Sequence, residues 1–131
     1  MAFDPVEHSL PRAGRWVPFM HTLVLHGIDA TDAEFAMQVR DRWNVGQVRA
    51  DLGMAGSITS EGIRLVSVEI VDGLPVSTLN IRINKATMEV MPVAEPDGPS
   101  PLVYDLQITR SFQSPEILMR GAFVVQEGST H

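Results

Sequence analysis

The chain has no cysteine among its 131 residues, which excludes disulfides, thiolate zinc ligands and a cysteine nucleophile. Aromatic residues are scarce, at 6%, and acidic residues outnumber basic ones to give a net charge of −6. An acidic chain does not offer the basic face that phosphate backbones require, so we expect no nucleic-acid partner. No apolar run approaches the roughly 20 residues needed to cross a bilayer, so we expect no membrane partner either.

The stretch MAFDPVEHSLPRAG contains acids and prolines where a secretory signal needs an apolar core, and we expect a soluble protein made in a cytosol. Pro5 and Pro11 interrupt any helix there and bias the residues before them toward extended backbone. The composition, 44% hydrophobic, is sufficient for one core. We therefore predict an extended arm over residues 1–14 and a single β-sandwich domain over residues 15–128.

Apolar and polar residues alternate along most of the domain, which is typical of half-buried β-strands. The run 19–25 is apolar on both faces, so the sequence does not decide which of its two faces points to the core. Elsewhere the alternation assigns one face to the core. The inward positions that it predicts in the middle of the chain are Phe35, Met37, Val39, Leu79, Ile81 and Ile83.

Turn signals separate these runs. Asp72 and Gly73 stand between two alternating runs and predict a hairpin, because Gly accepts the positive φ that such turns require. Residues 53–62 are rich in Gly and Ser and predict a loop, with one short pairing at 57–59. Asn84 is a candidate cap for a short helix that begins at Lys85. The whole pattern predicts an all-β protein: about seven or eight antiparallel strands in a sandwich or small barrel, with one short helix.

The last predicted element is a hairpin over residues 102–128. Tyr104 and Leu106 share a face of its first strand, and Gly121, Phe123 and Val125 share a face of the return strand. We predict that these five residues form a structural motif that closes the sandwich. Tyr104 fits two interpretations equally: the tyrosine corner of immunoglobulin-type sandwiches, or an ordinary core aromatic.

Residues with catalytic or metal-binding chemistry are scattered. His21 and His26 are five positions apart on a predicted strand, so their side chains point to opposite faces. In the segment DATDAE, Asp29 and Thr31 suit turn chemistry better than a calcium loop, which needs more oxygen ligands. No Gly-x-Ser-x-Gly elbow occurs. We predict no catalytic residue, no cofactor and no metal.

Two tryptophans are the candidate partner surface. Trp16 follows the predicted arm, and Trp43 lies in a predicted turn around Asn44 and Gly46. Tryptophan is enriched at protein interfaces because it combines a large apolar ring with a polar N–H group. Packing at the ends of a sandwich is the alternative role for both.

Four segments occur in order along residues 17–128: LVLHGIDATDAEFAMQVRD, LNIRINKATMEVMP, YDLQIT and ILMRGAFVVQEG. Together they resemble small phage and prophage tail proteins, similar to the N-terminal domain of phage upper-baseplate and tail-fibre proteins. In that family a strand leads to a G-x-D-hydroxyl turn and an F-x-M-Q-V-R strand, and the domain closes on Y-D-L-Q-x-T and L-x-G-x-F-x-V. The first turn departs from the family, which tends to have an apolar residue and a Gly there.

The resemblance implies an immunoglobulin-like β-sandwich that serves as a structural adaptor and transfers no catalytic residues. We therefore expect a non-enzymatic, baseplate-associated protein of a phage or prophage tail that acts by docking to other tail proteins or to copies of itself. Its expected location is the virion tail, or the bacterial cytoplasm when the prophage is inactive. Two alternatives stay open: a carbohydrate-binding sandwich with Trp16, Trp43 and Tyr104 as its platform, and a small hydrolase with a polar-lined pocket.

Overall fold

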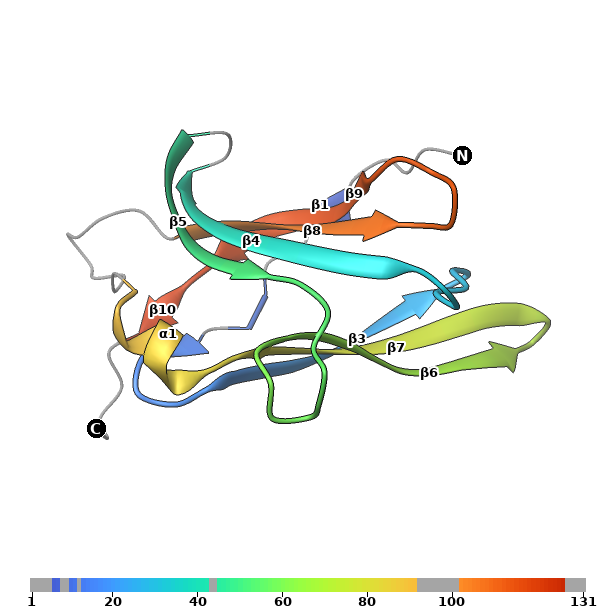
Figure 1. Ribbon diagram of the computed structural model, residues 1–131, viewed down its shortest axis with the longest axis horizontal. Helices are drawn as coiled ribbons and strands as arrows, with labels where there is room; N and C mark the ends of the chain where they lie inside the picture. The colour runs from blue at the N-terminus through green and yellow to red at the C-terminus, as the bar shows by residue number, and fades with distance from the viewer. Residues whose placement is uncertain (1–5, 8–9, 12, 43–44, 92–101, 127–131) are drawn as a thin grey trace.

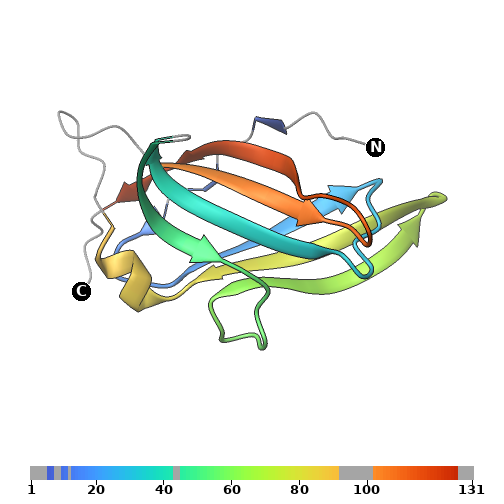
Figure 2. The same ribbon diagram turned by 45° about the horizontal axis from the view of Figure 1, so that its top comes forward.

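The protein is a sandwich of two β-sheets that face each other across one core (Figures 1 and 2). The computed structural model describes residues 6–7, 10–11, 13–42, 45–91 and 102–126. The all-β sandwich with one short helix that the sequence predicts is confirmed. The larger sheet contains β1 (Val6–Glu7), β9 (Glu116–Phe123), β8 (Leu102–Thr109), β4 (Glu34–Arg42) and β5 (Val45–Leu52), in that order.

The smaller sheet contains β3 (Phe19–His26), β7 (Leu74–Ile83) and β6 (Gly62–Val71), with β7 in the middle. All pairs of long strands within the two sheets are antiparallel. A short pair of β2 (Ala13–Gly14) and β10 (Val125–Gln126) lies near the only helix of the described residues, α1 (Lys85–Glu89) (Figure 1). Both β3 and β6 are therefore edge strands of the smaller sheet.

The core follows the predicted alternation closely. The six predicted inward residues of β4 and β7 are all buried, with at most 2% of their surface exposed. The open question in β3 is resolved, because Phe19, Leu23 and Leu25 are buried while Met20 and Val24 face solvent. The five residues of the predicted closing motif are buried as well: Tyr104, Leu106, Gly121, Phe123 and Val125.

Strand register explains the closing motif. Tyr104 lies opposite Gly121 on the neighbouring strand, so the residue without a side chain faces the large ring. Phe123 makes an edge-on contact with Phe19 of the other sheet, with 5.1 Å between ring centroids. The motif thus joins the two layers. Tyr104 is 2% exposed, which makes it a core residue and removes it as a surface platform for sugars.

Turns and the helix form largely where the sequence places them. Asp72 and Gly73 both have positive φ, 51° and 79°, as the tight turn of the β6–β7 hairpin requires. The helix starts after Asn84, whose side chain accepts a bond from Arg82 Nε at 2.7 Å and makes no capping bond. The predicted pairing at 57–59 is wrong: the loop instead pairs at Met54 with Ile63.

The N-terminal arm runs along the last strands of the sandwich. Its described residues form β1, which pairs in parallel with β9, and β2, which pairs in parallel with β10. Between them the amide of Leu10 donates to the carbonyl of Ala122 at 3.2 Å. Leu10 and Ala13 are 5% and 3% exposed. These two arm residues therefore contribute to the same core as the rest of the domain.

Candidate docking surfaces

Phe112 is the most exposed large apolar side chain of the described residues, with its whole surface open to solvent (108% of the reference value). It lies in the turn between β8 and β9, which is closed by a bond from the amide of Gln113 to the carbonyl of Arg110 at 3.0 Å. An ion pair between Arg110 and Glu116, 3.4 Å long, bridges the base of the same turn. The backbone of Phe112 has φ 60°, a conformation that bulky residues rarely adopt.

The β6–β7 hairpin ends on the same side of the molecule as this turn, and both figures show it reaching past the strands of the larger sheet. Three large apolar residues flank its turn: Ile70, Val71 and Leu74 are 69%, 48% and 59% exposed. We call Phe112 and these three residues the distal surface. The sequence analysis did not predict this surface. Apolar residues directly beside a Gly turn could have indicated it, because the tip of a hairpin extends beyond the core and leaves such residues exposed.

The turn after β2, which contains Trp16, lies beside α1 at the opposite end of the sandwich (Figure 1). The Arg15 guanidinium stands over the Trp16 ring, 5.1 Å from the centroid, while Arg15 Nε donates to the carbonyl of Glu89 at 3.0 Å. This bond holds the turn against the end of α1. Val17 and Val90, on either side of the junction, are 51% and 72% exposed. Trp43, the second predicted partner residue, lies outside the described residues.

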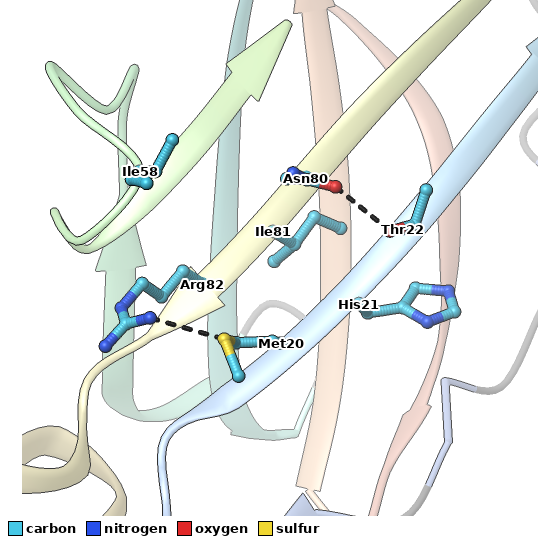
Figure 3. A pocket seen from close by; sticks show the side chains of 7 residues that line it. All are labelled: Met20, His21, Thr22, Ile58, Asn80, Ile81 and Arg82. Carbon is cyan, nitrogen blue, oxygen red and sulfur yellow. Dashed lines mark hydrogen bonds between the residues drawn. The ribbon is translucent and has the colours of Figure 1, made fainter. Parts of the chain in front are cut away.

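A shallow groove of about 250 Å³ crosses the outer face of the smaller sheet (Figure 3). Its polar groups bind one another: Thr22 Oγ1 donates to Asn80 Oδ1 at 3.0 Å, and Arg82 Nη1 contacts Met20 Sδ at 3.2 Å. Ile58, from the loop before β6, overhangs it and is 70% exposed. The groove offers an apolar rim rather than a set of converging polar groups.

A second groove, of about 320 Å³, is lined mainly by apolar side chains of β3 and β9. It lies where the edge of β3 approaches the larger sheet, and Leu23, Val24, Leu118 and Met119 form most of its wall. Leu118 and Met119 are both buried because a register shift in the β8–β9 ladder turns neighbouring residues to the same side. Strict alternation with Gly121, Phe123 and Val125 would place Met119 inward and Leu118 outward.

Asp105 on β8 carries a partly buried carboxyl with a shifted pKa. Burial raises the pKa of this carboxyl above its usual range, while the charge of Arg40 lowers it in part. Asp105 lies between Gln38 and Arg120 of the neighbouring strands, and its Oδ1 has no hydrogen-bond partner among the described residues. Arg40 directs its guanidinium to the amide oxygen of Gln38. The carboxyl lies on a strand face and lines neither groove.

Other candidate residues behave as turn or strand residues. The carboxylate of Asp29 accepts the amide of Thr31 at 2.9 Å, and hydrogen bonds from the side chain and backbone of Thr31 lower the pKa of Asp29, which confirms the predicted turn chemistry. His21 and His26 lie opposite Ile81 and Val76 in the β3–β7 ladder, on opposite faces. In the described part of the chain, no three metal-ligating side chains come together, and no helix has the length and hydropathy of a membrane span.

No protein-family model matches the chain, and no curated protein is significantly similar to it.

Proposed function

We propose that this chain is a non-enzymatic structural adaptor of a phage or prophage tail, associated with the baseplate, that works by docking to other tail proteins. The observation that supports docking is Phe112, whose ring is entirely exposed on a strained backbone. A positive φ at a non-Gly residue costs of the order of 1–3 kcal/mol, and such strain is typically kept at functional positions. The phage assignment is supported by the order of the four sequence segments described above.

The distal surface has the composition of an interface centre. Aromatic residues are enriched at protein interfaces, and the fully buried centre of an interface is more apolar than the rest of a protein surface. Ile70, Val71 and Leu74 supply the aliphatic part from a different hairpin on the same side of the molecule. Because both hairpins are held in the ladders of the two sheets, the partner would meet a preformed surface and little ordering would be needed on binding.

Trp16 is a second docking candidate at the other end. Arg15 already covers one face of its ring, which leaves less of the ring for stacking on a sugar. With Tyr104 buried, the carbohydrate-binding alternative has no exposed aromatic pair among the described residues. Titration of the tryptophan fluorescence with sugars tests that alternative directly.

The experiment that tests the proposal uses the phage or prophage that carries the gene. Deletion of the gene should stop tail assembly or leave tails without a complete baseplate, as seen by electron microscopy, and the wild-type gene should restore them. The variant Phe112→Asn should fail to restore them, because Asn accepts a positive φ and removes only the ring. Ile58→Asn, which makes the same kind of change at another exposed apolar side chain (70%) outside the distal surface, is the control and should restore tails.

Normal tails after deletion would overturn the proposal. Full restoration of tails by Phe112→Asn would show that the distal surface is not the docking surface. The same assay with Val90→Glu would then test the end of the sandwich that carries Trp16. Thermal unfolding of purified Phe112→Asn distinguishes a docking defect from a folding defect, because the fully exposed ring makes no core contact and the variant should be at least as stable as the wild type.

A further inference from the structure

The free edge of β6 is a pairing surface that the other described residues leave open. β6 is ten residues long, ends the smaller sheet, and pairs only with β7. On its other side, Ile63 bonds to the loop before it: its amide donates to the carbonyl of Gly53 at 2.8 Å and its carbonyl accepts from the amide of Ala55 at 2.9 Å. From residue 64 to residue 71, no described segment lies along this edge.

The outward backbone groups can be identified from these bonds. Because Ile63 points its amide and carbonyl away from β7, alternate positions of the strand do the same. A bulge between Leu65 and Ser67 adds one residue, so the outward positions after Ile63 are Leu65, Val68 and Ile70. Pro75 agrees with the assignment of Ile70 as an outward position. It lies opposite Ile70 and has no amide hydrogen to donate to β6.

We propose that this edge pairs with the same edge of a second copy of the chain, antiparallel and about a two-fold axis at Val68. In this register Leu65 lies opposite Ile70 of the partner copy, Val68 opposite Val68, and Ile70 opposite Leu65. Every free outward group of the three residues is then bonded. The two smaller sheets join into one continuous six-stranded sheet, with β6 and its copy in the middle.

The neighbouring antiparallel register is unfavourable. A shift by two residues would place Ile70 of one copy opposite Ile63 of the other, whose amide and carbonyl are already bonded to Gly53 and Ala55. The loop at Met54 occupies the position that the incoming strand would need there. The loop thus limits the pairing to the open part of the edge, and of the registers left there the one centred on Val68 bonds all three outward residues.

Charge complementarity supports a second copy as the occupant. The bulge places Arg64 and Glu69 on the same outer face, since they lie opposite Asn80 and Val76, two positions of β7 with the same parity. Within one chain they are about 13 Å apart along the strand and form no ion pair with a described residue. In the proposed pair, each Arg64 is the diagonal neighbour of the partner copy's Glu69, within reach of long side chains.

Exposed apolar residues lead to the same occupant. Val66 and Ile70 are 44% and 69% exposed in the single chain, and a long apolar edge strand is a template for uncontrolled association. In a two-fold dimer the β6 edge of each copy pairs with that of the other, so no β6 edge is left free. The dimer therefore covers the exposed edge strand and cannot grow into a fibre through it. This inference does not rest on the proposed function, because self-pairing through β6 requires no tail partner.

Cross-linking tests the register, and the absence of native cysteine makes it specific. Ser67 of one copy lies opposite Glu69 of the other on the outer face, at a pair without mutual backbone bonds, where side chains are closest. A mixture of the single variants Ser67→Cys and Glu69→Cys, one of them carrying a tag, should give a disulfide-linked heterodimer under mild oxidation. A mixture of Ser67→Cys with Thr78→Cys, on the same face of β7, is the control and should not.

Light scattering on the wild-type chain gives the second readout, with a dimer expected. Glu69→Lys should weaken the dimer about tenfold, because two like-charge diagonals replace two opposite-charge ones, and the double variant Arg64→Glu with Glu69→Lys should restore it. Ser67→Cys and Glu69→Cys keep the ladder to β7, so a failure of folding does not obscure the result. A wild-type chain that stays monomeric at its highest soluble concentration, or a dimer that does not cross-link between positions 67 and 69, would overturn the proposal.

Discussion

The hydroxyl oxygen of Ser77 accepts a hydrogen bond from the amide of Ala30 at 2.9 Å, across 47 residues of sequence. The same hydroxyl donates to the carbonyl of Ile28 at 2.6 Å. Ser77 is the only buried polar residue of the described chain, and Ala30 is fully buried. One side chain on the central strand of the smaller sheet therefore satisfies two backbone groups of the turn that crosses to the larger sheet.

Replacing Ser77 by Ala should lower the free energy of unfolding by about 2 kcal/mol, because a buried amide and a buried carbonyl lose their partner. Urea denaturation measures the change. Ser67→Ala, on the outer face of the same sheet, is the matched control and should change stability by less than about 0.5 kcal/mol. Equal stability of Ser77→Ala and the wild type would show that water satisfies these two groups.

Gly62 is required by its backbone and by its surroundings. It has φ 140°, and a Cβ at this position would stand 2.6 Å from the carbonyl oxygen of Gly53. Gly62→Ala should therefore cost about 2 kcal/mol or more and loosen the loop that bonds to Ile63. Gly56→Ala, in the same loop with no atom near its Cβ position, should be close to neutral. Thermal unfolding of both variants measures the difference. Equal melting temperatures would contradict the claim that a Cβ at position 62 strains the backbone.

Asp105→Asn should stabilise the protein at neutral pH by about 1 kcal/mol, because a carboxylate with an unsatisfied buried oxygen is removed. Burial, opposed in part by Arg40, raises the pKa of Asp105, so the folded protein takes up this proton more readily than the unfolded chain. Stability of the wild type should thus fall as pH rises from the usual carboxyl pKa of 3.8 through the higher folded-state value.

The gain from Asp105→Asn should accordingly shrink as the pH is lowered toward 3.8, because protonation of the folded-state carboxyl removes the charge that burial disfavours. Asp51→Asn changes an exposed carboxyl at the end of the same sheet and is the control. Urea unfolding at several pH values measures both. A loss of stability at neutral pH would mean that the attraction to Arg40 outweighs the burial of the carboxylate.

Most of the fold could be predicted from the sequence because alternation has a fixed period. The inward residues of β4 and β7, the Asp72–Gly73 turn and the helix after Asn84 follow from local rules alone. Bulges were not predictable in this way. The shift between Leu65 and Ser67 moves Arg64 and Glu69 to one face, and no local sequence signal marks it.

The candidate surfaces were harder to predict, because exposure depends on where a hairpin ends relative to the opposite sheet. Trp16 was found from its residue type, whereas Phe112, Ile70 and Leu74 were not predicted as surface residues. The two bonds of Ser77 were equally hidden, since they join segments that only the packed sandwich brings together. Local pattern predicts which side of a strand is buried, and tertiary packing decides which apolar residues are left outside.

The most direct test of the proposed function is to search for the chain in assembled particles. Phage or tail particles purified from the host that carries the gene should contain the chain in a fixed ratio to the major tail proteins, by quantitative mass spectrometry. Immunogold labelling should place it at the baseplate end. Complete, infectious particles that lack the chain would contradict the account.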